Sequence, residues 1–129
     1  MLDNEVKALA QAKNFAALTT LLPGGQPMTQ VMWVDADEEA LLINTEVHRQ
    51  KFKNVSRDPR VTVTVIDATN PYRYAEVRGR VVGTVGGKEA RDHIDKLAGK
   101  YTGQPYDPSA ITSERVILRI APERQRVNG

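Results

Sequence analysis

Residues 45–60, with the sequence TEVHRQKFKNVSRDPR, gather the side chains best suited to binding an anion. They hold five of the chain's eighteen Lys and Arg residues against two acids, Glu46 and Asp58. The apolar run 41–43 precedes them and the alternating run 61–66 (VTVTVI) follows, which predicts a strand, a short basic helix and a second strand. A helix that starts just beyond a strand presents free N–H groups and the positive end of its dipole. The segment therefore predicts a phosphate site.

Helical geometry limits which of these cations can contact one anion. Residues three or four apart are neighbours on a helix, whereas residues two apart lie on nearly opposite sides. Arg49 and Lys53 can share a helical face, but Arg49 and Lys51 meet the same anion only if one lies in the non-helical lead-in. Phe52 and Val55 are then the buried side. The alternative is a solvated amphipathic helix whose charges contact no ligand.

No other catalytic constellation stands out in the sequence. The 129 residues contain no cysteine, which excludes disulfides, thiolate metal sites and a cysteine nucleophile. The two histidines, His48 and His93, lack metal-ligand spacing, and we expect His93 at the surface or its boundary. A Ser/His/Asp set and paired carboxylates are also missing. Any reaction would then rely on a cofactor that carries the chemistry.

Length and composition predict one globular domain that spans residues 1–129. The net charge of +2 is small and locally concentrated. This favours a local anionic ligand over nucleic acid, which usually needs a broad basic face. The N-terminus lacks the pattern of a signal peptide and no apolar run approaches membrane-spanning length, so we expect a cytoplasmic protein without a membrane partner.

The periodicity of the chain predicts a small β-barrel with helices packed outside it. Leu2, Val6 and Leu9 indicate a short opening helix that Asn14 closes. Strands are predicted over 15–22, 26–35, 40–45, 60–67, 72–85 and 115–121, and a second clear helix over 88–101 with the apolar stripe Ala90, Ile94, Leu97 and Tyr101. The result is a mainly β fold of six or so antiparallel strands.

Particular residues refine this prediction. Pro23-Gly24-Gly25 predicts a hairpin, and Gly79 predicts a bulge or bend inside the long strand. The apolar run 31–34 suggests a strand covered on both faces, and Trp33 within it is expected to anchor the core or an interface. Residues 122–129 are polar and basic, and we expect them to be loosely held.

Four stretches carry a resemblance that covers nearly the whole chain: GGQPMTQVMWVD (24–35), NTEVHRQKFKNVSRDPRVTVTV (44–65), YAEVRGRV (74–81) and DKLAGKYTG (95–103). The chain resembles the flavin- and deazaflavin-binding split β-barrel superfamily, typified by pyridoxamine 5'-phosphate oxidase. More narrowly, it is similar to the small F420-dependent members. The most specific part is Thr-x-x-x-Arg-x-Lys-x-x-Asn followed by Arg-Asp-Pro-Arg-Val.

The resemblance implies a homodimer with two cofactor sites at the subunit interface. It places the cofactor ring against residues 28–32 and the phosphate at the end of the third strand and the start of the basic helix. Thr45, Arg49, Gln50 and Lys51 would hold the phosphate, with Lys53 and Asn54 as secondary candidates. The full set of implied cofactor-binding residues is Met28, Gln30, Val31, Met32, Asn44, Thr45, Arg49, Gln50, Lys51, Lys53 and Asn54.

The second strand bears on the identity of the cofactor. Flavin-using oxidases of this superfamily typically carry a basic residue early in that strand, whereas residues 28–33 (MTQVMW) carry no charge. The resemblance therefore implies coenzyme F420, with FMN as the alternative. The acidic lactyl-glutamate tail of F420 would suit the extra cations Lys53 and Arg57, although solvated surface charges explain them equally well.

Three hypotheses of function follow. The first is an oxidoreductase that transfers a hydride between coenzyme F420 and a small organic substrate. The second is a carrier of flavin, haem or deazaflavin without turnover. The third, a nucleic-acid-binding protein, ranks last because Phe52 is the one aromatic residue among the cations and is better used in the core.

Overall fold

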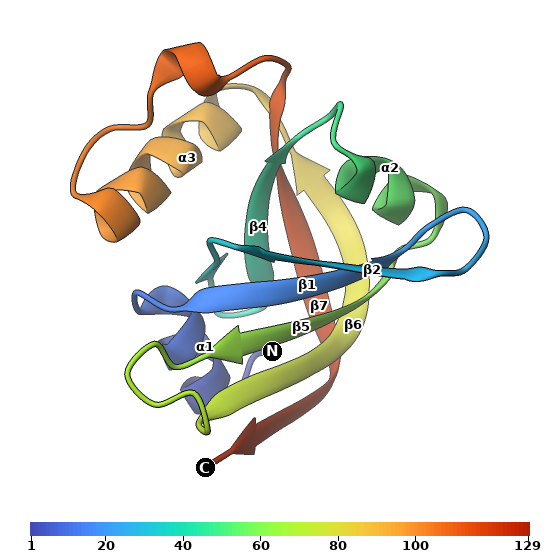
Figure 1. Cartoon of the computed structure of the whole chain (residues 1–129), viewed down its shortest axis with the longest axis vertical. Coiled ribbons are helices and arrows are strands. Elements are labelled where there is room, and N and C mark those ends of the chain that lie inside the picture. The colour runs from blue at the N-terminus through green and yellow to red at the C-terminus, as the bar shows by residue number, and fades with distance from the viewer.

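The computed structural model describes residues 1–129 as one seven-stranded antiparallel sheet with three α-helices around it. The strand order is β2-β1-β5-β6-β7-β4-β3, and the sheet curls into a half-barrel (Figure 1). The strands are β1 (Phe15–Leu21), β2 (Pro27–Met32), β3 (Asp35–Ala36), β4 (Leu41–Glu46), β5 (Arg60–Ile66), β6 (Tyr74–Val85) and β7 (Arg115–Asn128), and the helices are α1 (Asn4–Gln11), α2 (Gln50–Arg57) and α3 (Gly87–Thr102), with a 3₁₀ turn η1 (Pro108–Ala110). The predicted mainly β fold with outer helices is confirmed, with seven strands in place of about six.

The alternating valines of β5 form the centre of the core. Val61, Val63 and Val65 are buried, while the residues between them are half-buried on the outer face. Val63 pairs with Leu18 of β1, which is also buried. Nineteen buried residues form one apolar cluster with these side chains, and α1 adds Val6 to it. The alternation read from the sequence therefore specifies the buried face.

The long strand β6 bends where the sequence predicted. Its pairing with β7 shifts register between Arg78 and Gly79, and again between Val81 and Gly83. A Cβ atom at Gly79 would collide with the carbonyl oxygen of Ala121 on β7, so only glycine allows this close approach. The two shifts let β6 and β7 curl together around the core.

The prediction that residues 122–129 are loosely held is wrong. Strand β7 continues to Asn128 and pairs with β6 as far as Tyr74. Pro122 lies opposite Gly79 at the register shift, where the regular ladder is already interrupted, so its missing N–H group is tolerated. The first half of β6 needs a partner, and this polar segment provides it.

The predicted strand 26–35 is in fact two strands. Strand β2 ends at Met32, and the two-residue β3 pairs with the far edge of the sheet through Leu41 and Leu42 of β4. The prediction that both faces of this strand are covered is also wrong for the single chain, because Val31 is 69% exposed. Strand β2 is an edge strand, with β1 as its one neighbour in the sheet.

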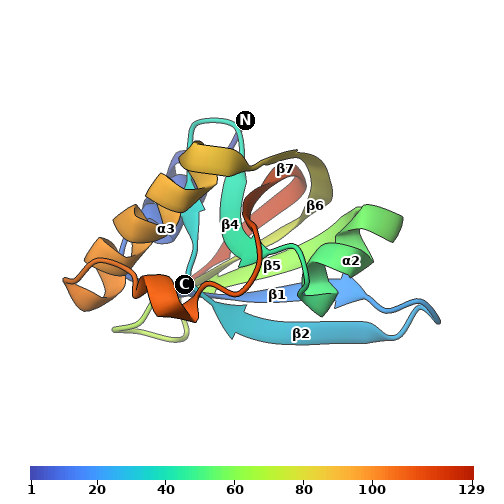
Figure 2. The ribbon, with the colours of Figure 1, turned by 90° about the horizontal axis from the view of Figure 1, so that it is seen from above.

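The helices lie at different places on the half-barrel (Figures 1 and 2). Helix α1 packs against β3, β5 and β7, α2 packs against β1, and α3 packs against β4 and β7.

The predicted stripe of α3 is buried as expected: Ala90, Ile94, Leu97 and Tyr101. His93 is also buried, at 9% exposure, which corrects the expectation of a residue at the surface or its boundary. It is buried because it faces polar partners on β3 and β4. None of the helices has the length and apolar character needed to cross a membrane.

Candidate functional site

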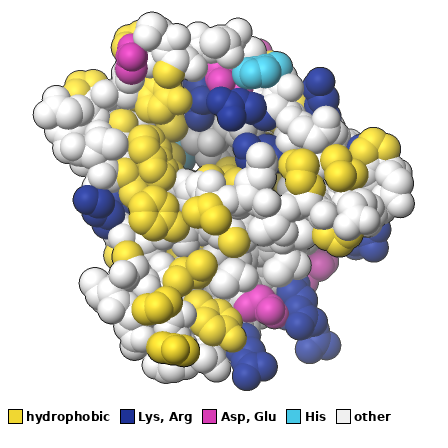
Figure 3. All heavy atoms as spheres, viewed as in Figure 1, with side chains coloured by type: hydrophobic (Ala, Val, Ile, Leu, Met, Phe, Trp, Pro, Cys, Tyr) yellow, Lys and Arg dark blue, Asp and Glu magenta, His cyan; other side chains and the backbone are white.

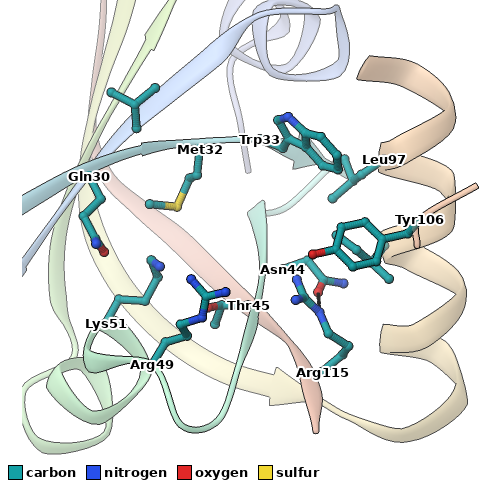
Figure 4. A pocket seen from close by; sticks show the side chains of 12 residues that line it. Gln30, Met32, Trp33, Asn44, Thr45, Arg49, Lys51, Leu97, Tyr106 and Arg115 are labelled. Atoms are coloured by element: carbon teal, nitrogen blue, oxygen red, sulfur yellow. Dashed lines mark hydrogen bonds between the residues drawn. The ribbon is translucent and has the colours of Figure 1, made fainter. Parts of the chain in front are cut away.

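A pocket of about 330 Å³ opens between α2, α3 and the strands β2, β4 and β7, and we call it the central pocket. Its walls differ in character (Figures 3 and 4). Hydrophobic side chains from β2 and α3 line one side, and Lys and Arg side chains line the other. The lining residues are Gln30, Val31, Met32, Trp33, Asn44, Thr45, Arg49, Lys51, Ile94, Leu97, Tyr106 and Arg115.

Arg49 and Lys51 reach the central pocket together because Arg49 is not helical. It is the residue before α2, with extended backbone angles (φ −72°, ψ 147°), and Lys51 is the second residue of the helix. The sequence allowed a shared anion only under this condition. Lys51 is 8% exposed. Burial, and then the positive charges of Arg49 and Arg115, lower the pKa of Lys51 below its ordinary value.

Arg115 is a third cation that the sequence reasoning missed. It begins β7 and is 8% exposed. Its Nε donates to Asn44 Oδ1 at 2.8 Å, and its guanidinium lies 5.4 Å from the ring centroid of Tyr106. Burial lowers the pKa of Arg115, and the charge of Arg49 adds to this effect. Nothing in its local sequence separates it from an ordinary strand residue.

Glu46 is the buried counter-ion of these cations. Its Oε1 accepts from the backbone N–H groups of Thr112 (2.7 Å) and Ser113 (2.9 Å). Its Oε2 lies 3.5 Å from Arg49 Nη2 and 3.7 Å from Arg115 Nη1 and has no hydrogen bond. Burial alone would raise the pKa of Glu46, but the two N–H groups and the charge of Arg115 lower it overall. Glu46 is therefore ionised at neutral pH.

The charges of the central pocket do not balance. Arg49, Lys51 and Arg115 bring three positive charges, and Glu46 brings one negative charge. Two of the cations are buried, and a buried charge is costly without a partner. The pocket is therefore suited to a ligand group with about two negative charges, such as a phosphate.

The opposite wall is aromatic and aliphatic. The ring of Trp33 stacks on Tyr101 of α3, with centroids 5.0 Å apart and an interplanar angle of 4°. Tyr106 meets Trp33 edge-on, with centroids 6.2 Å apart. Trp33 is only half-buried, so it forms the pocket wall as well as anchoring α3. A planar apolar group beside an anionic one matches the two walls.

Of the residues predicted to bind a cofactor, the structure brings seven to the central pocket: Gln30, Val31, Met32, Asn44, Thr45, Arg49 and Lys51. It does not bring Met28, Gln50, Lys53 and Asn54 there. Asn54 is fully buried and donates to Thr20 Oγ1 (3.0 Å), while Gln50 donates to Asn54 Oδ1 (2.8 Å). Lys53 is exposed on the far side of α2, two positions from Lys51. Met28 lies nearer the hairpin end of β2.

The residues that sequence reasoning left out of the site come from distant parts of the chain. They are Trp33, Glu46, Ile94, Leu97, Tyr106 and Arg115. One signal was present in the sequence, because Ile94 and Leu97 belong to the predicted apolar stripe of α3. The pairing of β4 with β7 places Arg115, and the edge-on contact with the ring of Trp33 places Tyr106.

The family model described as pyridoxamine 5'-phosphate oxidase matches residues 2–128. The chain belongs to this family. Its half-barrel is the split-barrel fold of pyridoxamine 5'-phosphate oxidase-like proteins, whose members bind flavin-type cofactors. Membership indicates an oxidoreductase of the flavin type. No curated protein matches the chain.

Solved structures place this member within the pyridoxamine 5'-phosphate oxidase-like group. A structure named F420 reductase is 33% identical, with a TM-score of 0.83 and coverage of 97% of this chain and 98% of that one. A conserved hypothetical protein from Mycobacterium tuberculosis is 26% identical, with a TM-score of 0.78 over 99% of this chain and 84% of that one. A putative pyridoxamine 5'-phosphate oxidase from Listeria innocua (21% identity, TM-score 0.67, 96% and 95% coverage) shares the fold.

Proposed function

We propose that this protein is an oxidoreductase that uses coenzyme F420 to transfer a hydride to or from a small organic substrate. The observation that carries the proposal is the surplus of two positive charges beside an apolar aromatic wall in one pocket. The similarity to a structure named F420 reductase supports the choice of cofactor. When bound, the coenzyme supplies the hydride chemistry, and the protein supplies binding, orientation and exclusion of water.

The residues of the central pocket divide this work between them. Arg49, Lys51 and Arg115 would bind the phosphate of the coenzyme through charge-assisted hydrogen bonds. Gln30 and Thr45 offer hydrogen-bonding groups along the pocket between the two walls, while the amide of Asn44 is bonded to Arg115. Met32, Trp33 and Leu97 would contact the ring system and keep water away from it. No side chain in this set needs to act as a general acid or base.

We further propose that the active form is a homodimer with the substrate bound at the interface. Val31 lines the central pocket but is 69% exposed, so the pocket is open on the side of β2. The outer side of the β1–β2 hairpin is bare of helices (Figure 2). A second copy on this side would close the pocket. Sedimentation of the wild-type protein and of a Val31→Lys variant tests this, with a dimer expected for the first and a monomer for the second.

FMN is the second candidate cofactor. Its phosphate monoester carries about two negative charges at neutral pH, which equals the surplus of the pocket. One observation argues against FMN: β2 offers no cation. F420 differs from FMN in that its phosphate is a phosphodiester, followed by a tail with further carboxylates.

Titration with both cofactors tests the proposed function. Trp33 is the only tryptophan and lines the pocket, so quenching of its fluorescence reports occupancy. We expect tighter binding of F420 than of FMN, followed by consumption of reduced F420 when an acceptor is added. Tighter binding of FMN would move the protein to the flavin-dependent branch. Binding of F420 without turnover against a panel of quinone, nitro and tetrapyrrole acceptors would favour a carrier.

A further inference from the structure

A row of buried and half-buried polar side chains lies behind the cationic wall of the central pocket. Arg115 Nε donates to Asn44 Oδ1 (2.8 Å), a contact drawn in Figure 4. Asn44 Nδ2 lies 3.0 Å from His93 Nδ1, and His93 Nε2 lies 3.0 Å from Asp35 Oδ2. His93 and Asp35 do not line the central pocket. The row nonetheless connects α3 and β3 to one of the three cations.

The partners of Asn44 fix the orientation of its amide. Nδ2 donates to the carbonyl oxygen of Ala90 (2.9 Å), and Oδ1 accepts from Arg115. A rotated amide would place two acceptors together at Ala90 and two donors together at Arg115. Nδ1 of His93 must therefore accept the second N–H of Asn44, and its Nε2–H donates to Asp35. The whole row has one consistent arrangement of donors and acceptors.

We propose that Asp35 and His93 are positioning residues that hold Arg115 toward the bound anion through Asn44, and that protonation of His93 on Nδ1 releases this hold. The assignment of the anion as a cofactor phosphate rests on the proposed function, but the coupling itself does not. A proton on Nδ1 meets the N–H of Asn44, so the amide must rotate or withdraw. Either movement removes the acceptor of Arg115 Nε. Anion binding and protonation of His93 therefore each weaken the other.

Other charged groups surround His93, and four of them form ion pairs with each other. Asp35 Oδ2 also accepts from Lys96 (3.0 Å), and Asp37 binds Arg119 (2.7 Å). Glu89 and Asp92 border the same side of α3, and Arg115, on β7, is the end of the row. The second histidine, His48, has its Nδ1 2.5 Å from Ser113 Oγ and lies on the chain next to Arg49. A proton there adds a positive charge near the pocket and strengthens anion binding, which is the opposite sign.

The test compares three proteins in a His48→Gln background: the parent, His93→Gln and His93→Leu. A Gln amide can accept from Asn44 and donate to Asp35 but does not titrate, whereas Leu can do neither. The probe is inorganic sulfate, whose charge is constant between about pH 5 and about pH 8, where histidine titrates. The second readout needs no ligand: the ¹H–¹⁵N signal of Arg115 Nε–H, assigned by its loss in Arg115→Lys.

In the parent, we expect sulfate affinity to fall about tenfold from about pH 8 to about pH 5, with faster solvent exchange of Arg115 Nε–H. His93→Gln should keep the affinity of the parent at high pH and show no fall. His93→Leu should be about tenfold weaker throughout. Equal pH profiles in all three proteins, or absence of sulfate binding by the parent, would overturn the proposal.

Val77→Ala serves as the stability control, because Val77 is fully buried on β6 in the apolar cluster and not in the row. If it loses sulfate affinity as much as His93→Leu does, affinity follows stability and the positioning role is refuted. The proposed function can be refuted independently of this inference. Proteins that show the sulfate result but bind neither F420 nor FMN would keep this inference and refute the cofactor assignment.

Discussion

The part of the half-barrel that α1 covers has an apolar interior, whereas the part between α2, α3 and the start of β7 buries charged groups. Nineteen buried apolar residues form one cluster in the first region. The second region holds the buried ionisable residues Asp35, Glu46, Lys51, His93 and Arg115. Apolar burial stabilises the fold directly, but burial of a charge does so only when a partner is present.

The charged region is the one suited to a ligand. In the apolar region the clustered side chains carry no charge, so none needs a charged partner from outside the chain. In the charged region burial lowers the pKa of both Lys51 and Arg115, which means that the folded chain disfavours their charged forms. A bound anion would reverse this effect. The charged region is therefore expected to be the less stable one until a ligand occupies it.

The largest expected effect is on the free energy of unfolding, and it distinguishes the apolar region from the charged region within one strand, β7. Ile120 is fully buried in the apolar cluster, five residues after Arg115. Ile120→Ala should lower the free energy of unfolding by about 2–5 kcal/mol in urea denaturation. Cofactor affinity, measured where the variant is folded, should change less than about twofold. A parallel loss of affinity would show that the two regions are not separate.

The same substitution at two lysines tests the charged region. Lys51→Met should weaken cofactor binding by about 1.5–3 kcal/mol, the range for a hydrogen bond to a charged group. It should not lower the stability of the unliganded protein, because the buried charge that it removes has no full partner. Lys53→Met, on the exposed face of α2, should change both quantities by less than about 0.5 kcal/mol. Equal effects of the two variants would remove Lys51 from the site.

Lys51 also predicts a dependence of stability on pH. Its pKa in the folded protein lies below the ordinary 10.5, so the folded state releases the proton first as pH rises. Stability should therefore increase between the lowered pKa and 10.5 in the wild type relative to Lys51→Met. Urea denaturation across the alkaline range measures this difference, and parallel curves for the two proteins would contradict it.

Local sequence patterns were sufficient for the apolar faces of the strands and helices. The alternation in β5, the stripe of α3 and the glycine in β6 each depend on residues close in the chain, and each prediction is confirmed. The extension of β7 to Asn128 was missed because its residues are polar and carry no strand signal of their own. That segment is a strand because β6 needs a partner there.

The charged region depends on contacts that no local pattern contains. The basic helix predicted an anion site, but only two of its cations, Arg49 and Lys51, line the pocket. The third cation arrives because β4 pairs with β7, which sets Glu46 opposite Arg115 across 69 residues of sequence. His93 was expected at the surface or its boundary because its partners, Asn44 and Asp35, lie on strands far from it in the sequence.

Glu46→Gln should have a smaller effect on the charged region. The amide keeps an acceptor for the N–H groups of Thr112 and Ser113 but loses the charge that faces Arg49 and Arg115. We expect a loss of about 1–2 kcal/mol in stability at neutral pH. The pKa of Glu46 is below its ordinary 4.5, so the wild-type advantage should be complete above that pH and decline as pH falls through the folded value. An advantage that persists in strong acid would refute the role of the charge.

Trp33 lies on the boundary between the two regions, and its replacement should have the smallest effect. Its ring stacks on Tyr101, whose hydroxyl accepts from the backbone N–H of Val34 (3.1 Å), while its other side lines the central pocket. Trp33→Phe keeps an aromatic ring of smaller area, so we expect a loss of about 0.5–1.5 kcal/mol in stability. Tyr101→Phe, which keeps the stack but removes the hydroxyl, is the matched control.

Trp33 has two roles to distinguish, docking of α3 and forming a wall of the pocket, and ligand binding distinguishes them. If Trp33 serves only to dock α3, Trp33→Phe should lower the melting temperature and leave cofactor affinity unchanged. If it is also a wall of the pocket, the variant should bind the cofactor more weakly while Tyr101→Phe binds it as the wild type does. The position of Trp33 in the central pocket predicts the second result, which calorimetric titration of the three proteins would measure, because Trp33→Phe removes the fluorescent reporter.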